Sequence, residues 1–145
     1  MSPSPGPILV VGGSGLLGRE LTRQGRLAGH RVVATFHRGA PAVAGVDWRH
    51  LDIRIRDDVT ALILAVRPDV VVNAAYQQSD WATTADGGTH VALAAAAVSA
   101  RLVHVSSDAV FSGTADSYDE SHTNTQARLV TRLRGAREFL IPTPR

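Results

Sequence analysis

The feature that most constrains this chain is a short apolar run followed at once by three regularly spaced glycines. Residues 8–11 (ILVV) have the composition of a strand buried on both faces of a parallel sheet. Gly12, Gly15 and Gly18 come next, and residues 16–28 continue with apolar side chains at helical spacing. A buried strand, a glycine-rich turn and a helix in this order predict the start of a βαβ unit.

The rest of the chain repeats this alternation of apolar runs and helical patterns. Leu17, Leu21 and Ala28 share one face of the first predicted helix. The expected strands are 8–11, 31–36, 46–52, 70–72 and 102–105, and the expected helices lie within 16–28, 57–67 and 83–100. Such a chain predicts an α/β fold with a doubly wound parallel sheet and right-handed crossovers.

Polar residues set the starts of the second and third predicted helices. Asp57 and Asp58 favour a helix N-terminus, where acids meet the positive end of the helix dipole. Residues 59–66 then place apolar side chains at i, i+3, i+4 and i+7, which predicts one buried face. Thr83 or Thr84 is expected to cap the third, alanine-rich helix.

The composition removes several kinds of chemistry. The sequence has no cysteine, which excludes disulfides, thiolate nucleophiles and cysteine-ligated metals. All 15 basic residues are arginine, so no lysine amine serves catalysis. The net charge is only +2, and the positive charge is concentrated in residues 126–145, which hold five arginines and one acid. We therefore do not expect a nucleic-acid-binding surface on the body of the protein.

The sequence also bears on where the protein resides. No stretch approaches the ~20 apolar residues of a membrane-spanning helix. Residues 1–7 lack the basic start and apolar run of a signal peptide. A cytoplasmic protein without a membrane partner is expected.

The glycines and the helix after them suit a dinucleotide. Gly12 permits the tight turn, Gly15 lets the backbone approach a pyrophosphate, and Gly18 lets helix and strand pack closely. The start of the helix, at Leu16 and Leu17, offers free N–H groups to the phosphates. The alternative is a turn that joins strand to helix without a ligand. A Walker phosphate loop is excluded, because it needs a lysine.

The end of the second predicted strand bears on the choice of cofactor. An NAD-selective site usually carries an acid about 20 residues beyond the glycines, where it binds the ribose 2′-hydroxyl. Residues 35–38 (TFHR) contain no acid, and Arg38 with Thr35 or His37 suits a 2′-phosphate. NADP(H) is therefore the preferred cofactor and NAD(H) the alternative. In the other interpretation Arg38 is a solvated loop arginine.

Together with the glycine turn, three further segments resemble extended short-chain dehydrogenases/reductases, and most closely the dTDP-4-dehydrorhamnose reductase group. Residues 51–54 (LDIR) resemble the end of the family's third strand, where the acid and its neighbour border adenine. Residues 67–76 (RPDVVVNAAY) are similar to the family's R-P-D-V-V-x-N-A-A segment, which lines the ribose near the nicotinamide. Residues 103–113 (VHVSSDAVFSG) resemble the strand and loop that carry the catalytic Ser or Thr, which is Ser107 here. Taken alone, Asn73 reads as a strand-end turn residue and Ser107 as a cap.

The likeness covers residues 8 to about 120 and stops where the family's catalytic pair should follow. In that family a tyrosine exchanges the proton as hydride moves, and a lysine four residues later lowers its pKa. This sequence has no lysine, and its two tyrosines are Tyr76 and Tyr118. The arginine-rich run 127–145 stands where that helix should begin. A frameshift, an early stop, a cloned fragment or a natural short variant would each give this pattern.

The resemblance implies a Rossmann-type NADP(H)-binding domain at 1–120, C-terminally truncated relative to the family, and a divergent arginine-rich tail at 121–145. It also implies a reductase of a nucleotide sugar, in which Ser107 polarises the carbonyl; the alternatives are a non-catalytic NADP-binding module and an inactive truncated product. Truncation would expose sheet edges or apolar helix faces, so self-association is expected. No metal site is expected, and the expected cofactor-binding residues are Gly12, Gly15, Leu16, Leu17, Gly18, His37, Arg38, Asp52, Ile53, Asn73, Ala74, Ala75 and Tyr76.

Overall fold

The computed structural model describes residues 5–41, 43–106, 114–117, 119 and 121, and Ser107 and Tyr118 lie outside them. The chain divides after Val105 into two units, and the elements below belong to the first. In order they are β1 (Ile8–Val11), α1 (Leu16–Leu27), β2 (Val32–Phe36), β3 (Asp47–His50), α2 (Arg56–Val66), β4 (Val70–Asn73), the π-helical turn η1 (Ala82–Gly87), α3 (Gly88–Ala97) and β5 (Arg101–His104).

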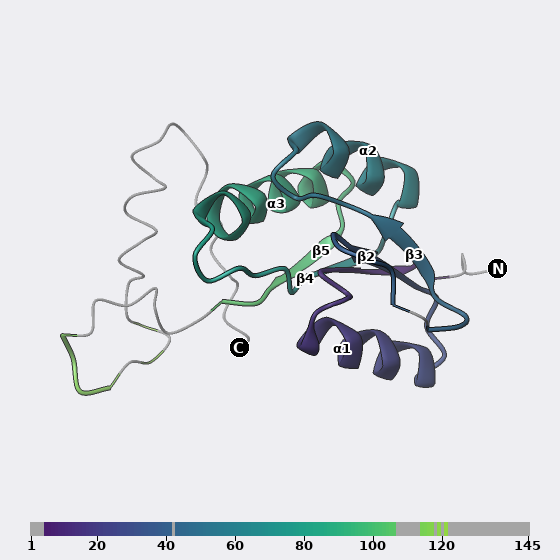
Figure 1. Cartoon of the computed structure of the whole chain (residues 1–145), viewed down its shortest axis with the longest axis horizontal. Helices are drawn as coiled ribbons and strands as arrows, with labels where there is room; N and C mark the ends of the chain where they lie inside the picture. Colours follow the sequence, from purple (N-terminus) through teal and green to yellow (C-terminus); the bar gives the residue numbers. More distant parts are fainter. Residues whose placement is uncertain (1–4, 42, 107–113, 118, 120, 122–145) are drawn as a thin grey trace. The chain divides into compact units, whose positions relative to one another are not determined.

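The five strands form one parallel sheet in the order β3-β2-β1-β4-β5. β1 is the central strand, and Leu9 lies opposite Val33 on one side and Val71 on the other. Helix α1 covers one face of the sheet, and α2 and α3 cover the other (Figure 1). The doubly wound parallel sheet is confirmed. Its strand order reverses between β1 and β4, which is where such sheets bind ligands at their carboxyl ends.

The larger part of the core lies between the sheet and the helices α2 and α3. Val59 and Ile63 of α2 are completely buried, and Leu62 and Val66 pack beside them. The apolar face predicted for this helix is therefore confirmed. Asp57 and Asp58 lie in its first turn, also as predicted.

On the other face of the sheet, α1 is rotated relative to the sequence prediction. Leu17 remains 46% exposed and Ala28 is the exposed C-cap residue, so of the three predicted positions only Leu21 packs against the core. The buried positions are Gly18 and Thr22 instead. The reason is steric: without a Cβ, Gly18 lets the helix approach the backbone of the glycine turn, and this close contact decides which side faces the sheet.

The third helical segment also begins and ends differently from the prediction. Its cap is Asp80, whose carboxylate accepts hydrogen bonds from the Thr83 N–H (3.3 Å) and hydroxyl (2.7 Å). The predicted caps Thr83 and Thr84 therefore lie inside the helical segment, within the π-helical turn η1. α3 ends at Ala97 and not at residue 100, because Ser99 adopts a left-handed conformation (φ 57°).

Among the described residues, no helix has the length and apolar character needed to cross a bilayer.

Candidate functional site

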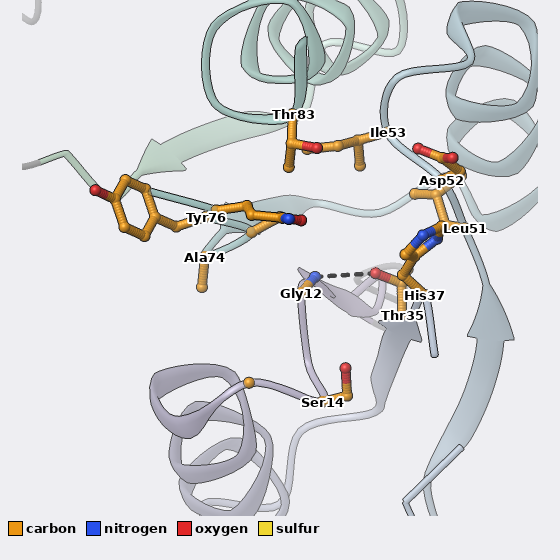
Figure 2. Close-up of a pocket in the computed structure, with 13 residues that line it drawn as sticks. Gly12, Ser14, Thr35, His37, Leu51, Asp52, Ile53, Ala74, Tyr76 and Thr83 are labelled. Carbon is orange, nitrogen blue, oxygen red and sulfur yellow. Dashed lines mark hydrogen bonds between the residues drawn. The ribbon is translucent and has the colours of Figure 1, made fainter. Parts of the chain in front are cut away.

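A pocket of about 180 Å³ opens at the carboxyl ends of β1, β2, β3 and β4 (Figure 2). Gly12 and Ser14 lie on one side of it, and Ile53 and Thr83 lie on the opposite side. Because parallel strands end at the same edge, loops that are distant in sequence meet here. The lining residues are Gly12, Ser14, Gly15, Thr35, His37, Leu51, Asp52, Ile53, Ala74, Ala75, Tyr76, Gln77 and Thr83.

The glycine turn forms the floor of this pocket. Gly12 has a φ of 80°, and a Cβ built on it would lie 2.6 Å from the backbone nitrogen of Ala75. The Gly15 N–H closes the turn on the Gly12 carbonyl (3.1 Å). No side-chain oxygen caps the first turn of α1, which begins directly after the lining residue Gly15. The turn therefore presents backbone without bulky side chains, at Ser14 and Gly15, to a ligand that enters the pocket.

Thr35 holds the turn in place from the neighbouring strand. Its hydroxyl accepts the Gly12 N–H at 3.0 Å, and its side chain is only 2% exposed (Figure 2). Thr35→Val keeps the shape of the side chain but leaves the Gly12 N–H without an acceptor, so we expect a loss of about 1–3 kcal/mol of stability. Urea unfolding measures it. Thr35→Ser keeps the hydroxyl and is the control; equal losses in both variants would contradict the role of this hydrogen bond.

Asn73 does not line the pocket itself but holds the lining segment that follows β4. It is only 1% exposed, and its Oδ1 accepts the N–H of Ala75 at 3.2 Å. Its Nδ2 lies 3.2 Å from Nδ1 of His104 on β5. Since the amide nitrogen can only donate, Nδ1 of His104 is the acceptor and the ring is neutral, with its proton on Nε2. Partial burial, which lowers the pKa of His104, favours the same neutral form.

Asp52 places a fixed negative charge at the side of the pocket. Arg54 donates to both of its carboxylate oxygens, at 2.6 Å to Oδ2 and 2.9 Å to Oδ1. These hydrogen bonds lower the pKa of Asp52 from 3.8 to about 2. Arg54 also lies 3.7 Å from the carboxylate of Asp80, the cap of the third helical segment. Asp52 is thus ionised at neutral pH and fixed in orientation.

This pair predicts a pH dependence of stability. Because the pKa of Asp52 is lowered by folding, its contribution is complete above pH 3.8 and is lost as the pH falls towards 2. We expect Arg54→Met to return the pKa of Asp52 towards 3.8, followed by the carboxyl ¹³C shift in an NMR titration. Arg49→Met removes the same kind of pair from Asp47 and should leave Asp52 unchanged. An unaltered titration in Arg54→Met would contradict this account.

The structure brings together most of the residues expected from the sequence at this pocket. Gly12, Gly15, His37, Asp52, Ile53, Ala74, Ala75 and Tyr76 line it, whereas Leu16, Leu17, Gly18, Arg38 and Asn73 do not. Of these, Gly18 and Asn73 are buried behind it, and Leu16 is 95% exposed. Arg38 is exposed in the loop after β2. Ser107 lies outside the described residues.

Four lining residues were not singled out as ligands by sequence reasoning. Ser14 and Leu51 stand directly beside residues that were, so their proximity was the available signal. Gln77 follows the β4 segment in the same way. Thr83 had no such signal, because it reaches the pocket through the packing of η1 against the loop after β3. The described residues contain no cluster of three His, Cys, Asp or Glu side chains that would hold a metal.

Comparison with known proteins agrees with the resemblance in the sequence. A family model described as the RmlD substrate binding domain matches residues 6–129. The chain is 37% identical to a dTDP-4-dehydrorhamnose reductase of Streptomyces griseus over 134 residues, which cover 84% of this chain and 40% of that protein. It is 30% identical to the rat methionine adenosyltransferase 2 subunit beta, covering 92% of this chain and 42% of the relative. The chain thus spans less than half the length of these two proteins.

Solved structures of other proteins share the fold of this chain. A hypothetical dTDP-4-dehydrorhamnose reductase from Sulfolobus tokodaii superposes with a TM-score of 0.71 at 24% identity, over 88% of this chain and 50% of that one, which supports the fold. The Bordetella bronchiseptica enzyme WbmG, solved in complex with NAD and UDP, superposes with a TM-score of 0.61 at 28% identity, over 70% of this chain and 37% of that one. With a family match over most of its length, the chain belongs to the RmlD substrate binding domain family.

Proposed function

We propose that this chain binds NADP(H) in the pocket at the carboxyl ends of the strands, as the nucleotide-binding part of a reductase that acts on a nucleotide sugar. The observation that carries the proposal is the bare glycine turn at the start of α1, facing a fixed carboxylate across the pocket. In this proposal the domain extends over residues 1–120. When bound, the cofactor supplies the hydride, and the protein supplies binding and orientation.

The residues present fit a dinucleotide. Gly15 carries no side chain and is exposed at the pocket, so a pyrophosphate reaches the backbone there. The uncapped N–H groups and the positive dipole end of α1 favour its negative charge. The ionised Asp52 accepts N–H or O–H groups from the nucleoside. Structural relatives solved with NAD support a nicotinamide cofactor.

The preference for NADP(H) over NAD(H) rests on the end of β2. No acid follows the strand at residues 35–38 to accept a ribose 2′-hydroxyl. His37 lines the pocket, whereas Thr35 is already engaged by Gly12. Arg38 is exposed next to His37 and would pair with a 2′-phosphate. Arg38→Gln should therefore weaken NADPH more than NADH.

The nucleotide-sugar substrate is inferred from the family. The Streptomyces griseus relative is a dTDP-4-dehydrorhamnose reductase, and WbmG was solved with UDP. Ser107 is proposed to polarise the substrate carbonyl, as the resemblance implies. Because the sequence contains no lysine, the Tyr-x-x-x-Lys pair that the family uses is missing from this chain.

A second candidate is a cofactor-binding module without chemistry of its own. The missing lysine favours it, and so does the similarity to a protein that is named as a subunit of methionine adenosyltransferase 2. The nucleotide would then stabilise a conformation that a partner protein recognises. In both candidates the cofactor binds in the same pocket. Only the reductase would convert a substrate.

Titration with NADPH and NADH, read by cofactor fluorescence and calorimetry, tests the cofactor binding that both candidates require. We expect NADPH to bind more tightly than NADH, and binding of neither would refute the assignment of the pocket. Oxidation of NADPH with dTDP-4-keto-6-deoxysugars then separates the candidates. A measurable rate excludes the non-catalytic module, and tight binding without any rate favours it.

A further inference from the structure

The wall of the pocket formed by Asp52 and Ile53 has no regular structure of its own, because β3 ends at His50 and α2 begins at Arg56. Its own hydrogen bonds close a turn, from the Ile55 N–H to the Asp52 carbonyl (3.1 Å) and from the Arg54 N–H to Asp52 Oδ1 (3.0 Å), and contacts with neighbouring elements hold this turn in place. The N–H of Leu51 donates to the Phe36 carbonyl (2.9 Å), which fixes the start of the loop. The rest of the wall is held by the helical segment that begins at Asp80.

Ile53 is the residue of the loop between β3 and α2 that contacts this helical segment. Its side chain is buried and packs against Gly87, where a Cβ would lie 2.5 Å from the Ile53 Cγ1 atom. Its carbonyl oxygen lies 2.9 Å from Nδ1 of His90, one turn further along. Since a carbonyl can only accept, Nδ1 of His90 carries the proton. Side chain and backbone of Ile53 are thus both held from behind the pocket.

We propose that His90 is a positioning residue for the adenine end of the nucleotide site, acting through the Ile53 carbonyl. The proposal rests on the proposed function, in which Asp52 and Ile53 border the base. His90 does not line the pocket, so it does not contact the ligand itself. Losing its hydrogen bond frees the Ile53 backbone to shift, and the side of the pocket proposed for the base shifts with it. The glycine turn on the opposite side of the pocket is unaffected.

The test compares binding of the two halves of the cofactor, with adenosine 2′,5′-bisphosphate (the adenosine probe) and reduced nicotinamide mononucleotide as probes in calorimetry. His90→Leu keeps the bulk but removes the donor, and His90→Asn keeps a donor in the position of Nδ1. We expect His90→Leu to weaken the adenosine probe about tenfold. His90→Asn should bind both probes as the unmodified chain does, and neither variant should change binding of the nicotinamide probe.

Gly87→Ala provides an independent perturbation of the same wall. The added methyl group pushes on the buried Ile53 side chain, so the adenosine probe should again be weakened selectively. Val91→Ala is the control for stability alone, because Val91 is completely buried on the same helix and does not line the pocket. It should destabilise the fold yet leave the affinities of the folded protein unchanged.

The outcomes separate this inference from the function on which it rests. If the unmodified chain binds neither NADPH nor the adenosine probe, both the proposed function and the role of His90 are refuted. If the unmodified chain binds but His90→Leu also binds normally, only the role of His90 is refuted. Equal weakening of both probes, or a His90→Asn variant as weak as His90→Leu, refutes it as well.

Discussion

Gly18→Ala is expected to destabilise the fold by about 3 kcal/mol, the upper end of the range for forcing one methyl group into a packed interior. A Cβ at this position would collide with the carbonyl oxygen of Gly12 and lie 2.7 Å from the Gly13 Cα atom. Both obstacles are backbone, so no side chain can rotate away to make room. The helix must move off the sheet, and it loses the close contact that orients α1.

Gly15→Ala is the matched control for this experiment. Its Cβ would meet the same Gly12 oxygen at 3.4 Å, an ordinary contact, and Gly15 has a φ of −73° that alanine adopts freely. As an N-cap substitution it should cost less than about 1 kcal/mol. Urea unfolding of both variants measures the difference. Equal stabilities would mean that α1 does not depend on the absence of a side chain at position 18.

Gly15→Val is expected to leave the fold nearly intact and to remove most of the affinity for NADPH. Its side chain would stand at the exposed edge of the pocket, in the space proposed for the pyrophosphate. Keeping the phosphates from one or two backbone N–H groups costs charge-assisted hydrogen bonds of about 1.5–3 kcal/mol each. The expected loss is therefore at least about tenfold in Kd.

Calorimetry with NADPH, beside an unfolding curve of the same variant, measures this effect. Because the unfolding curve reports the fold, weak binding cannot be mistaken for a damaged protein. A Gly15→Val variant that binds NADPH like the unmodified chain would place the phosphates elsewhere. Gly18→Ala should have the opposite effect, because it lowers the stability of the fold before it affects the affinity for NADPH.

Local pattern was sufficient where a segment has only one way to bury its side chains. The run 8–11 and the second helix are apolar at the spacings of a central strand and an amphipathic helix, and both lie where they were predicted. Gly12 could be predicted as a lining residue for the same reason, because it directly follows a predicted strand, whereas Asp52, the last residue of a predicted strand, was identified through the family resemblance. Parallel strands then bring such positions to one edge.

Residue spacing gave wrong predictions where contacts between secondary-structure elements decide which residues are buried or act as caps. Leu17 looks like a core residue, but Gly18 packs so closely on the turn that Leu17 is turned outward. Thr83 looks like a cap, but Asp80 begins the helix earlier. The role of His90 depends on a loop far away in sequence, with Ile53 as its partner. No local spacing carries that information.

The central place of β1 has a consequence for hydrogen exchange. It is paired with β2 on one side and β4 on the other, and Leu9, Val10 and Val11 are buried. Its amides therefore exchange with solvent only when the whole sheet opens, whereas those of β3 and β5, the outer strands among the described residues, exchange through local fraying. β1 runs directly into the glycine turn. The exchange rate of its slowest amides therefore reports global unfolding from positions within three residues of the pocket.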